Sequence, residues 1–462
     1  MGDLSLRPYQ KEDVAFLSRL QAGALFSEQR TGKTPTALMF CVEKKAKKIL
    51  IIAPASSLPV WADEFIKWTG KPCLIYDGNG AYKQRILEEW SHGLVMSYES
   101  LRPTEVANKM RGAIYDICLK DIDVVILDEA HRIKHHKTAN AKAAFMLKHV
   151  PYKLVLTGTP ASGKPEDVWS LLHFLYPNTF RGYWPFVTKY FRVEVMVNAD
   201  GREYRKLMGF NSAGEAMIQQ VLSAIAVQRK RIDVMPWLTP KEYVVVKLPL
   251  TAHQRKYLTD LEEMWETGDV VTIGTLDRLI RYRQICLAPA LVNLGGSSPK
   301  IKWILQYLED YPDRSVIIFS KFTSFLSLLS QKIKENNRVL AGATPIKERA
   351  EYVKDFQTRK LRILLLQIDA GKEALTLDTA EACIFCDRFP PIGDLLQAED
   401  RFVATTEAKS NKLSLVYYLV MKDSYDESLN ELILSRKNET DIINNFKHYM
   451  QKRKENRHGN RT

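Results

Sequence analysis

The sequence predicts an α/β protein made of two tandem lobes, each a parallel sheet flanked by helices, with small helical insertions. One observation is the length of 462 residues, which suits two domains that each bury a core of their own. Another is that short apolar runs alternate with helical patterns up to residue 160, as in βαβ units. The same alternation returns after residue 300, so we expect the architecture to occur twice.

Four apolar runs mark the strands of the first lobe. They cover residues 48–54, 92–98, 122–130 and 152–160. Each run ends in polar, glycine or proline residues, and ligands of open α/β sheets bind at the carboxyl ends of the strands. We therefore expect the chemistry of this lobe along one edge of its sheet. Residues 161–235 are helical in pattern and rich in aromatic residues, which predicts a helical appendage with a hairpin near residues 198–204.

Five further runs mark the strands of the second lobe. They cover residues 314–322, 337–344, 361–371, 381–387 and 414–420. Residues 250–298 predict a helical insertion, and residues 236–241, with two prolines, predict a linker. The lobes are thus expected to span 1–238 and 239–462. The basic tail at 446–462 is either an electrostatic arm or an inert, solvated end.

Composition narrows the class of partner. The formal net charge is +13 and the pI is about 9.2, which favours nucleic acid because basic side chains release counterions from phosphates. The alternative is a basic protein without such a partner. No apolar run approaches the roughly 20 residues that span a bilayer, and no export signal is visible, so we expect no membrane role and a cytoplasmic location. Six scattered cysteines suit free thiols in a reducing compartment.

A phosphate-binding loop is predicted at residues 27–38, SEQRTGKTPTAL. The main-chain amides before a helix N-terminus can hold phosphates, Lys33 can reach the β- and γ-phosphates, and Thr34 can hold Mg²⁺. Position 27 is serine where the full GxxxxGK[ST] pattern has glycine. The loop residues expected to contact the nucleotide are Arg30, Thr31, Gly32, Lys33 and Thr34.

The segment ILDEAH at 126–131 supplies a second nucleotide signal. Asp128 and Glu129 directly follow a buried strand, where one carboxylate can bind Mg²⁺ and its neighbour can orient the attacking water. An acidic surface turn is the alternative. A GKT motif roughly 95 residues before an apolar run that ends in DEAH seldom arises by chance, so the pair predicts a site for ATP and Mg²⁺.

Basic and aromatic clusters leave two interpretations each. The residues around 228–231, together with Arg278, Arg281 and Arg283, are candidates for phosphate contacts or for solvated helix faces. The aromatic residues at 183–191 could stack on bases, although large aromatics in a helical appendage more often form a core.

The order of motifs resembles the Swi/Snf family of helicase-like ATPases in helicase superfamily two. LRPYQ at 6–10 is similar to the N-terminal adenine-reading motif, which implies that Arg7 and Gln10 contact the base. The most specific likeness is the extended motif III at 156–177. Further motifs of the family resemble residues 51–65, 95–101, 227–241, 283–291, 316–326, 367–377 and 395–402. The resemblance implies two RecA-like lobes with ATP hydrolysed between them.

Several residue roles follow from the resemblance and from the ends of the predicted strands. Gly371 is expected at the nucleotide, and Gln397 and Arg401, four apart and so on one helix face, are expected to assist catalysis. His131, Thr157 and Thr159 are expected to couple ATP hydrolysis to the action on DNA. Candidate contacts to DNA phosphates are Pro54, Ser56, Ser97, Tyr98, Lys321, Thr323 and Gly342.

Two motifs depart from the family pattern. Where the family has a glycine-rich motif V, Gly371 is followed by Lys372, Glu373 and Ala374. Where the family usually has a second arginine in motif VI, the chain has Ala404, and that arginine is the one credited with stabilising transition-state charge. We therefore expect hydrolysis, but at a slow rate.

The resemblance implies a DNA-dependent ATPase that tracks on double-stranded DNA. A compact chain of this kind resembles the phage or bacterial branch, which implies remodelling of branched DNA by fork regression or Holliday-junction branch migration, in replication, recombination or repair. One alternative is removal of DNA-bound proteins. Another is an ATP-binding DNA scaffold with little hydrolysis, and RNA unwinding is a weaker rival because of the extended motif III.

Overall fold

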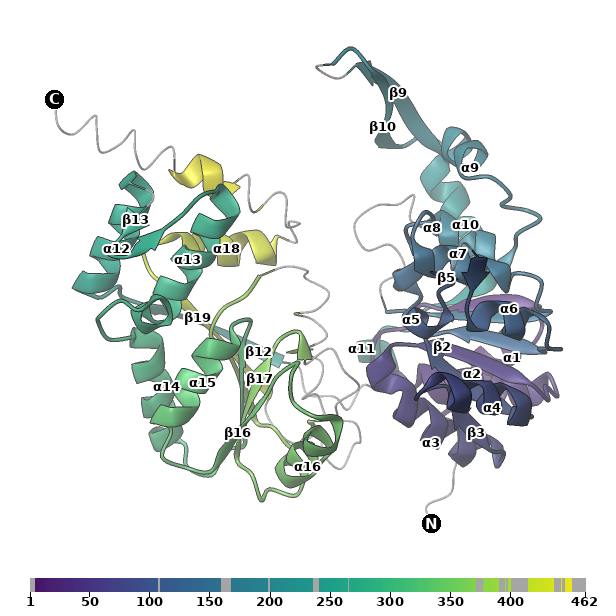
Figure 1. The fold of residues 1–462 in the computed structure, drawn as a ribbon, viewed down its shortest axis with the longest axis horizontal. Helices are drawn as coiled ribbons and strands as arrows, with labels where there is room; N and C mark the ends of the chain where they lie inside the picture. The colour runs from purple at the N-terminus through teal and green to yellow at the C-terminus, as the bar shows by residue number, and fades with distance from the viewer. Residues whose placement is uncertain are drawn as a thin grey trace. The chain divides into compact units, whose positions relative to one another are not determined.

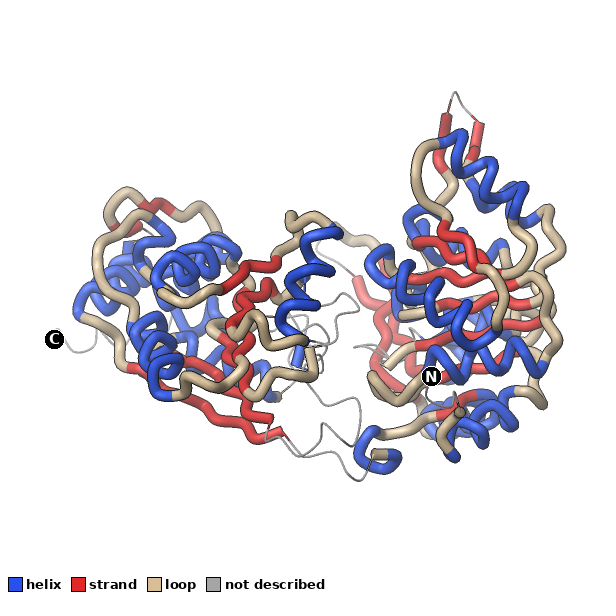
Figure 2. The backbone as a smooth tube through the Cα atoms, turned by 90° about the horizontal axis from the view of Figure 1, so that it is seen from below, coloured by secondary structure: helices blue, strands red, loops and turns tan. Residues whose placement is uncertain are grey.

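The computed structural model describes residues 5–106, 109–158, 168–197, 200–235, 241–264, 266–370, 377–389, 395, 398–399, 414–435, 442 and 445–450. The chain divides into two compact units, Met1–Pro236 and Trp237–Thr462. In each unit helices cover both faces of a parallel sheet, which confirms the predicted α/β class (Figures 1 and 2).

A parallel sheet of seven strands forms the centre of unit 1, in the order β11-β1-β8-β7-β2-β4-β3. β2 and β7 lie in its middle and are buried along their whole length, as expected for continuous aliphatic runs covered on both faces. The strands are β1 (Ala22–Leu25), β2 (Ile49–Ala53), β3 (Cys73–Ile75), β4 (Gly93–Ser97), β7 (Val124–Leu127), β8 (Tyr152–Leu156) and β11 (Ala226–Val227).

Two cores lie on opposite faces of this sheet. One core packs the sheet against α1 (Pro8–Leu17), α2 (Lys33–Glu43) and α3 (Leu58–Thr69), through residues such as Phe40 and Trp61. The other core packs it against five further helices. These are α4 (Gly80–Glu89), α5 (Tyr98–Leu101), α6 (Ala113–Cys118), α7 (Ala139–Met146) and α8 (Val168–Leu175), and a short hairpin of β5 (Thr104–Val106) and β6 (Lys109–Arg111) follows α5.

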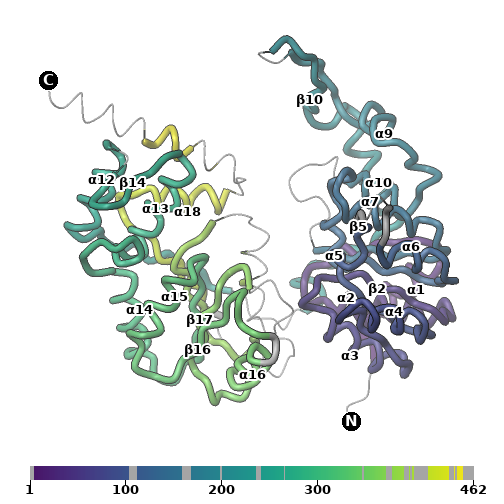
Figure 3. Tube along the Cα trace, viewed as in Figure 1, coloured from purple at the N-terminus to yellow at the C-terminus, as the bar shows by residue number. Residues whose placement is uncertain are grey.

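The predicted appendage contains helices and the predicted hairpin. Its hairpin, β9 (Phe191–Val197) and β10 (Glu203–Phe210), turns where the sequence predicts and projects away from the sheet (Figures 1 and 3). Phe186, Tyr190 and Phe191 are buried in a cluster of their own, as the core interpretation predicts, whereas Trp184 is 41% exposed. The helices are α9 (Tyr183–Tyr190), α10 (Gly214–Ile225) and α11 (Arg231–Val234).

Unit 2 contains a six-stranded parallel sheet in the order β12-β19-β18-β15-β17-β16. Five strands match the predicted runs, whereas the edge strand β12 lies in a segment for which no strand was predicted. The strands are β12 (Lys241–Leu248), β15 (Val316–Ser320), β16 (Asn337–Leu340), β17 (Ile363–Gln367), β18 (Ala382–Phe385) and β19 (Ser414–Met421).

Helices also cover both faces of the second sheet. α14 (Pro299–Asp310) and α15 (Thr323–Lys332) pack on one face. The other face carries α12 (Ala252–Met264), α13 (Thr275–Leu287), α16 (Ile346–Gln357) and α18 (Tyr425–Leu434). The predicted helical insertion therefore holds α12 and α13, with a small hairpin of β13 (Glu266–Thr267) and β14 (Val270–Val271) between them.

Candidate active site

The predicted phosphate-binding loop connects the end of β1 to the start of α2. Gly32 has a φ of 78°, and a Cβ at this position would lie 2.0 Å from Nε2 of Gln10, so only glycine fits. The Lys33 ammonium donates to the main-chain oxygens of Ser27 at 2.8 Å and Glu28 at 3.0 Å. The loop thus curls around its own lysine and holds that charge at the N-terminus of α2, which suits an anion.

The first turn of α1 holds this loop in place. Gln10 is 6% exposed, and its Nε2 donates to the oxygens of Thr31 and Gly32, both at 3.4 Å. Its Oε1 accepts from the main-chain nitrogen of Arg7 at 2.8 Å, and the Tyr9 hydroxyl donates to the Thr31 oxygen at 2.9 Å. Gln10 therefore shapes the loop, while its contact with a base remains a prediction.

Arg229 closes the loop from the opposite side. Its guanidinium donates to Oδ1 of Asp13 at 2.7 Å, its main-chain nitrogen donates to the Ser27 hydroxyl at 3.1 Å, and its oxygen accepts from the Glu28 nitrogen at 3.0 Å. Burial raises the pKa of Asp13, and Arg229 opposes that rise. Arg229 was predicted only as part of a basic run, because nothing in the sequence pairs it with Asp13.

Asp128 follows β7 at the same edge of the sheet. Trp61 donates its indole N–H to Oδ2 at 2.8 Å, and the main-chain nitrogen of Glu129 donates to Oδ1 at 2.9 Å. Burial raises the pKa of Asp128 to about 6, the Glu129 charge adds to the rise, and Trp61 and Lys33 oppose it. Lys33 and Asp128 therefore interact electrostatically across the site. The sequence gives no signal for the role of Trp61.

Glu129 lies in a left-handed backbone conformation, with a φ of 48°, directly after Asp128. Its Oε2 is 3.1 Å from Nδ1 of His131, and the same nitrogen is 3.5 Å from the hydroxyl of Thr157, which is fully buried at the end of β8. The structure thus brings three predicted residues, Glu129, His131 and Thr157, into one chain of polar contacts. Thr159 lies outside the described residues.

The oxygen atoms at this edge fit Mg²⁺. A buried carboxylate with a raised pKa gains from a divalent cation, because the cation favours the ionised form. Thr34, the second residue of α2, adds a hydroxyl next to Lys33. Asp128 and Thr34 are therefore the residues of this chain that would hold the metal.

Two candidate DNA residues of unit 1 have structural roles. Tyr98 is fully buried, and its hydroxyl donates to the main-chain oxygen of Asp128 at 2.7 Å, so the expectation of a DNA contact by this side chain is wrong. Ser97 is buried at the start of α5, and its Oγ accepts from the Ser100 nitrogen at 3.0 Å. Ser56 is exposed after β2 and Pro54 is half-buried, so both remain candidates.

In unit 2 the candidate DNA residues lie at the carboxyl ends of the strands. The Lys321 ammonium is 2.7 Å from Oδ1 of Asp369, and Thr323 begins α15. The main-chain nitrogen of Gly342 donates to Oε1 of Gln367 at 3.0 Å. Lys321, Thr323 and Gly342 therefore share one edge of this sheet, next to the ends of β15, β16 and β17.

A buried ion pair supports Lys321. Asp387 accepts from the Lys321 main-chain nitrogen at 3.1 Å and from the Ser320 hydroxyl at 2.5 Å, and Arg283 donates to its other oxygen at 2.7 Å. Arg283 is 5% exposed, and Arg278 is 6% exposed with a bond to the Leu261 oxygen. Both alternatives for these two arginines, a phosphate contact and a solvated face, are therefore wrong.

The remaining predicted residues of the active site, one at the nucleotide and two catalytic, belong to unit 2. Gly371, Gln397 and Arg401 lie outside the described residues. Their roles, and that of Ala404, remain implied by the resemblance alone.

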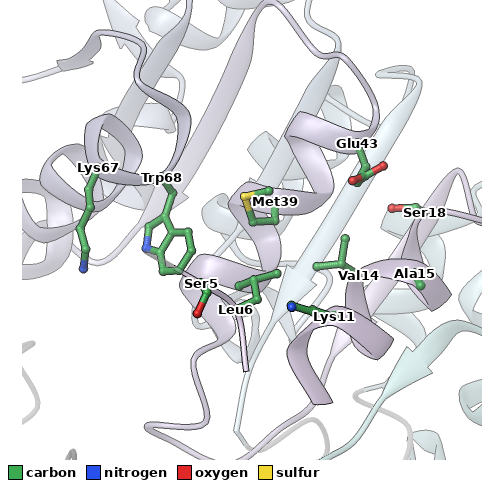
Figure 4. Close-up of a pocket in the computed structure, with 10 residues that line it drawn as sticks. All are labelled: Ser5, Leu6, Lys11, Val14, Ala15, Ser18, Met39, Glu43, Lys67 and Trp68. Atoms are coloured by element: carbon green, nitrogen blue, oxygen red, sulfur yellow. The ribbon is translucent and has the colours of Figure 1, made fainter. Parts of the chain in front are cut away.

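A cavity of about 600 Å³ opens beside the N-terminal motif (Figure 4). It is bounded by α1, α2 and α3. Lys11 and Val14 lie on one side, Trp68 lies on the other, and Met39 lies between the two sides. Leu6, next to Arg7 in sequence, also lines it. The cavity lies where α1 and α2 meet.

Two family models match most of the chain. The family described as the SNF2-related domain matches residues 9–291, and the Helicase conserved C-terminal domain matches residues 299–403. The chain belongs to the SNF2 family. In this SNF2-family chain the first match includes the loop at Lys33 and the carboxylates Asp128 and Glu129, and the second covers most of the unit 2 sheet.

Relatives of this SNF2-family chain are named as helicases. It is 27% identical to the Arabidopsis thaliana protein named Probable ATP-dependent DNA helicase CHR12, over 92% of this chain and 41% of that one. It is 25% identical to the Bos taurus DNA annealing helicase and endonuclease ZRANB3, over 91% and 39%. The chain spans about two fifths of the length of these two relatives.

Among solved structures, the chain is matched to the SWI2/SNF2 ATPase core of Sulfolobus solfataricus in complex with double-stranded DNA. It is 21% identical with a TM-score of 0.44, and the match covers 93% of this chain and 91% of that chain. Within the described part of this chain, no helix has the length and apolar character needed to cross a membrane.

Proposed function

We propose that this SNF2-family chain is an ATP-driven motor that moves along duplex DNA and remodels branched DNA. It would act by fork regression or Holliday-junction branch migration in replication, recombination or repair, in the cytoplasm of a bacterium or a phage-infected host. The single observation that carries the proposal is the arrangement of Lys33, Asp128 and Glu129 at one edge of a parallel sheet.

The chemistry of ATP hydrolysis follows from that arrangement. Lys33, at the N-terminus of α2, would bind the β- and γ-phosphates in place of the oxygens of Ser27 and Glu28. Asp128 and Thr34 would hold Mg²⁺, which supplies charge neutralisation when bound. Glu129, held by His131, would orient the attacking water.

Support for DNA as the track comes from charge and from the family. The net charge is +13, and the exposed Ser56 and the half-buried Lys321 lie after strand ends in units 1 and 2. Hydroxyls and lysines are suitable groups for contacts to DNA phosphates. The name of the bovine relative, a DNA annealing helicase and endonuclease, supports DNA as the substrate class.

A DNA scaffold that binds ATP with little hydrolysis is the second candidate. The observation that favours it is Ala404, at the position where the family usually has an arginine. This scaffold would bind DNA and ATP but release little phosphate when DNA is added.

Phosphate release measured with and without duplex DNA separates the two functions. The motor predicts that duplex stimulates release, and that Lys33→Ala abolishes it while DNA affinity stays close to that of the unaltered chain. Lys71→Ala, at an exposed lysine outside the site, is the matched control and should keep the stimulated rate. Turnover that survives in Lys33→Ala would exclude the assigned phosphate loop, and absence of stimulation in the unaltered chain would favour the scaffold.

A further inference from the structure

A second cavity of unit 1 opens at the sheet edge opposite to the nucleotide motifs. Its volume is about 630 Å³, within the range of small-molecule sites. Lys153, near the start of β8, lines it. The main-chain nitrogen of Lys153 donates to the main-chain oxygen of Gln21, just before β1. The motifs at Lys33 and Thr157 follow the other ends of these same two strands. The cavity is therefore separate from the candidate active site.

The charge of this cavity has one sign. Five side chains that carry or can carry positive charge line it, and no aspartate or glutamate does. These side chains are Lys148, His149, Lys153, His173 and Arg181. Lys148, His149 and Arg181 are exposed at its rim, so a ligand would meet them first.

Lys153 and His173 form a buried floor. Lys153 is 6% exposed, and its ammonium donates to the main-chain oxygen of Lys148 at 2.8 Å. Burial lowers the pKa of Lys153 to about 8, because a carbonyl offsets little of the cost of burying a charge. His173 is 8% exposed, its Nδ1 is 2.7 Å from the Phe180 oxygen, and burial lowers its pKa as well. An anion would supply the opposite charge that this floor lacks.

We propose that this cavity binds a phosphate-bearing anion. A phosphate group carries up to two negative charges and several acceptor oxygens on one compact centre, which matches the Lys153 ammonium of the floor and the cationic side chains of the rim. The phosphate could belong to a free nucleotide or polyphosphate, or to the backbone of DNA. The site goes beyond the proposed motor function, because nothing in ATP hydrolysis at Lys33 requires it.

Two probes test the site and separate its sources. Inorganic tripolyphosphate is titrated calorimetrically into the full chain carrying Lys33→Ala, so that the nucleotide loop contributes little. We expect residual binding that weakens about tenfold or more when Lys153→Met is added, since one charged contact is removed. Arg181→Ala, at the exposed rim, should weaken it severalfold, while Lys71→Met should leave it unchanged. A short labelled duplex is the second probe, with the same substitutions in the otherwise unaltered chain.

The outcomes identify the ligand. Loss of tripolyphosphate binding with unchanged duplex affinity indicates a free phosphate compound. Weaker duplex binding, with a salt dependence reduced by about one released ion, indicates DNA backbone. The melting temperature of Lys153→Met shows that the variant is folded, and Arg181→Ala tests the site without a buried change. If Lys153→Met and Arg181→Ala bind both probes as Lys71→Met does, the proposal is wrong.

Discussion

Glu129 and Asp128 are adjacent carboxylates with different surroundings. Asp128 is bound by the Trp61 indole and by the Glu129 main-chain nitrogen, while the side chain of Glu129 faces His131. This difference predicts separate roles, in which Asp128 holds the metal and Glu129 orients water.

Glu129→Gln is therefore expected to bind ATP normally and to lose about a hundredfold or more in turnover, because the amide cannot act as a base. Nucleotide binding and phosphate release, measured side by side, test this expectation. Glu89→Gln, at an exposed carboxylate in α4, is the control and should keep both properties. Loss of ATP binding together with turnover would show that the two roles are assigned wrongly.

Trp61 is expected to position Asp128. Trp61→Phe keeps the buried ring but removes the donor to Oδ2, so turnover should fall by about tenfold, the effect of losing one hydrogen bond to a charged group. The Mg²⁺ concentration for half-maximal turnover should rise, which a purely structural role would not cause. Trp68→Phe removes a similar bond to Glu64 in the same helix and should change neither value. Equal behaviour of the two variants would contradict the positioning role.

Lys153 gives a pH-dependent prediction for stability. The pKa of Lys153 is about 8 in the folded protein and near 10.5 in the unfolded chain. The buried charge therefore lowers the free energy of unfolding by its full amount below pH 8, and by progressively less as the pH rises to 10.5. Lys153→Met should therefore raise the melting temperature near pH 7, and the gain should shrink towards pH 10. Lys148, His149, His173 and Arg181 line the same cavity in both proteins, so these side chains are common to both sides of the comparison. A gain that is equal at both pH values would contradict the lowered pKa.

At the scale of elements, the strands that the sequence predicts are those with strong apolar runs. β2, β7, β15 and β17 are aliphatic almost throughout and buried on both faces, so the pattern identifies them without ambiguity. β1 has the sequence AGAL, whose small residues give a weak signal, and β11 has only two residues. β12, KEYVVVKL, also contains an apolar run, but it begins at the end of the predicted linker and was not predicted as a strand; as an edge strand it has only exposed or half-buried positions.

The candidate site also contains residues that the sequence predicts and contacts that it does not. Lys33, Asp128 and Glu129 were predicted because their chemistry is encoded in short local motifs. The contacts of Trp61 with Asp128 and of Arg229 with Asp13 join residues 67 and 216 positions apart. No local pattern encodes such pairs, because they arise only when strands and helices pack. The burial of Tyr98 was missed for the same reason, since its neighbours in sequence do not reveal that it lies beneath Asp128.

At the scale of the whole molecule, the proposed motor needs both units for turnover. Lys33 lies in unit 1, whereas Arg401, which the family resemblance assigns to the phosphate, belongs to unit 2. Arg401→Ala should cut DNA-stimulated turnover by about a hundredfold or more and barely change ATP affinity, because its charge would act mainly in the transition state. The melting temperature, measured beside the rate, detects a structural role instead. A folded variant with near-normal stimulated turnover would show that another basic residue, such as Arg388 or Lys372, supplies this charge.

The most direct test of a DNA-driven motor is the rate of ATP hydrolysis with linear duplex, single strand, fork and four-way junction, each at the same concentration of DNA nucleotides. We expect linear duplex to stimulate the rate well above that with single strand, and fork and junction to stimulate it further. Glu129→Gln should abolish every stimulated rate. A rate that is the same with and without all four DNAs, or that persists in Glu129→Gln, would contradict a DNA-driven motor with its active site at Lys33, Asp128 and Glu129.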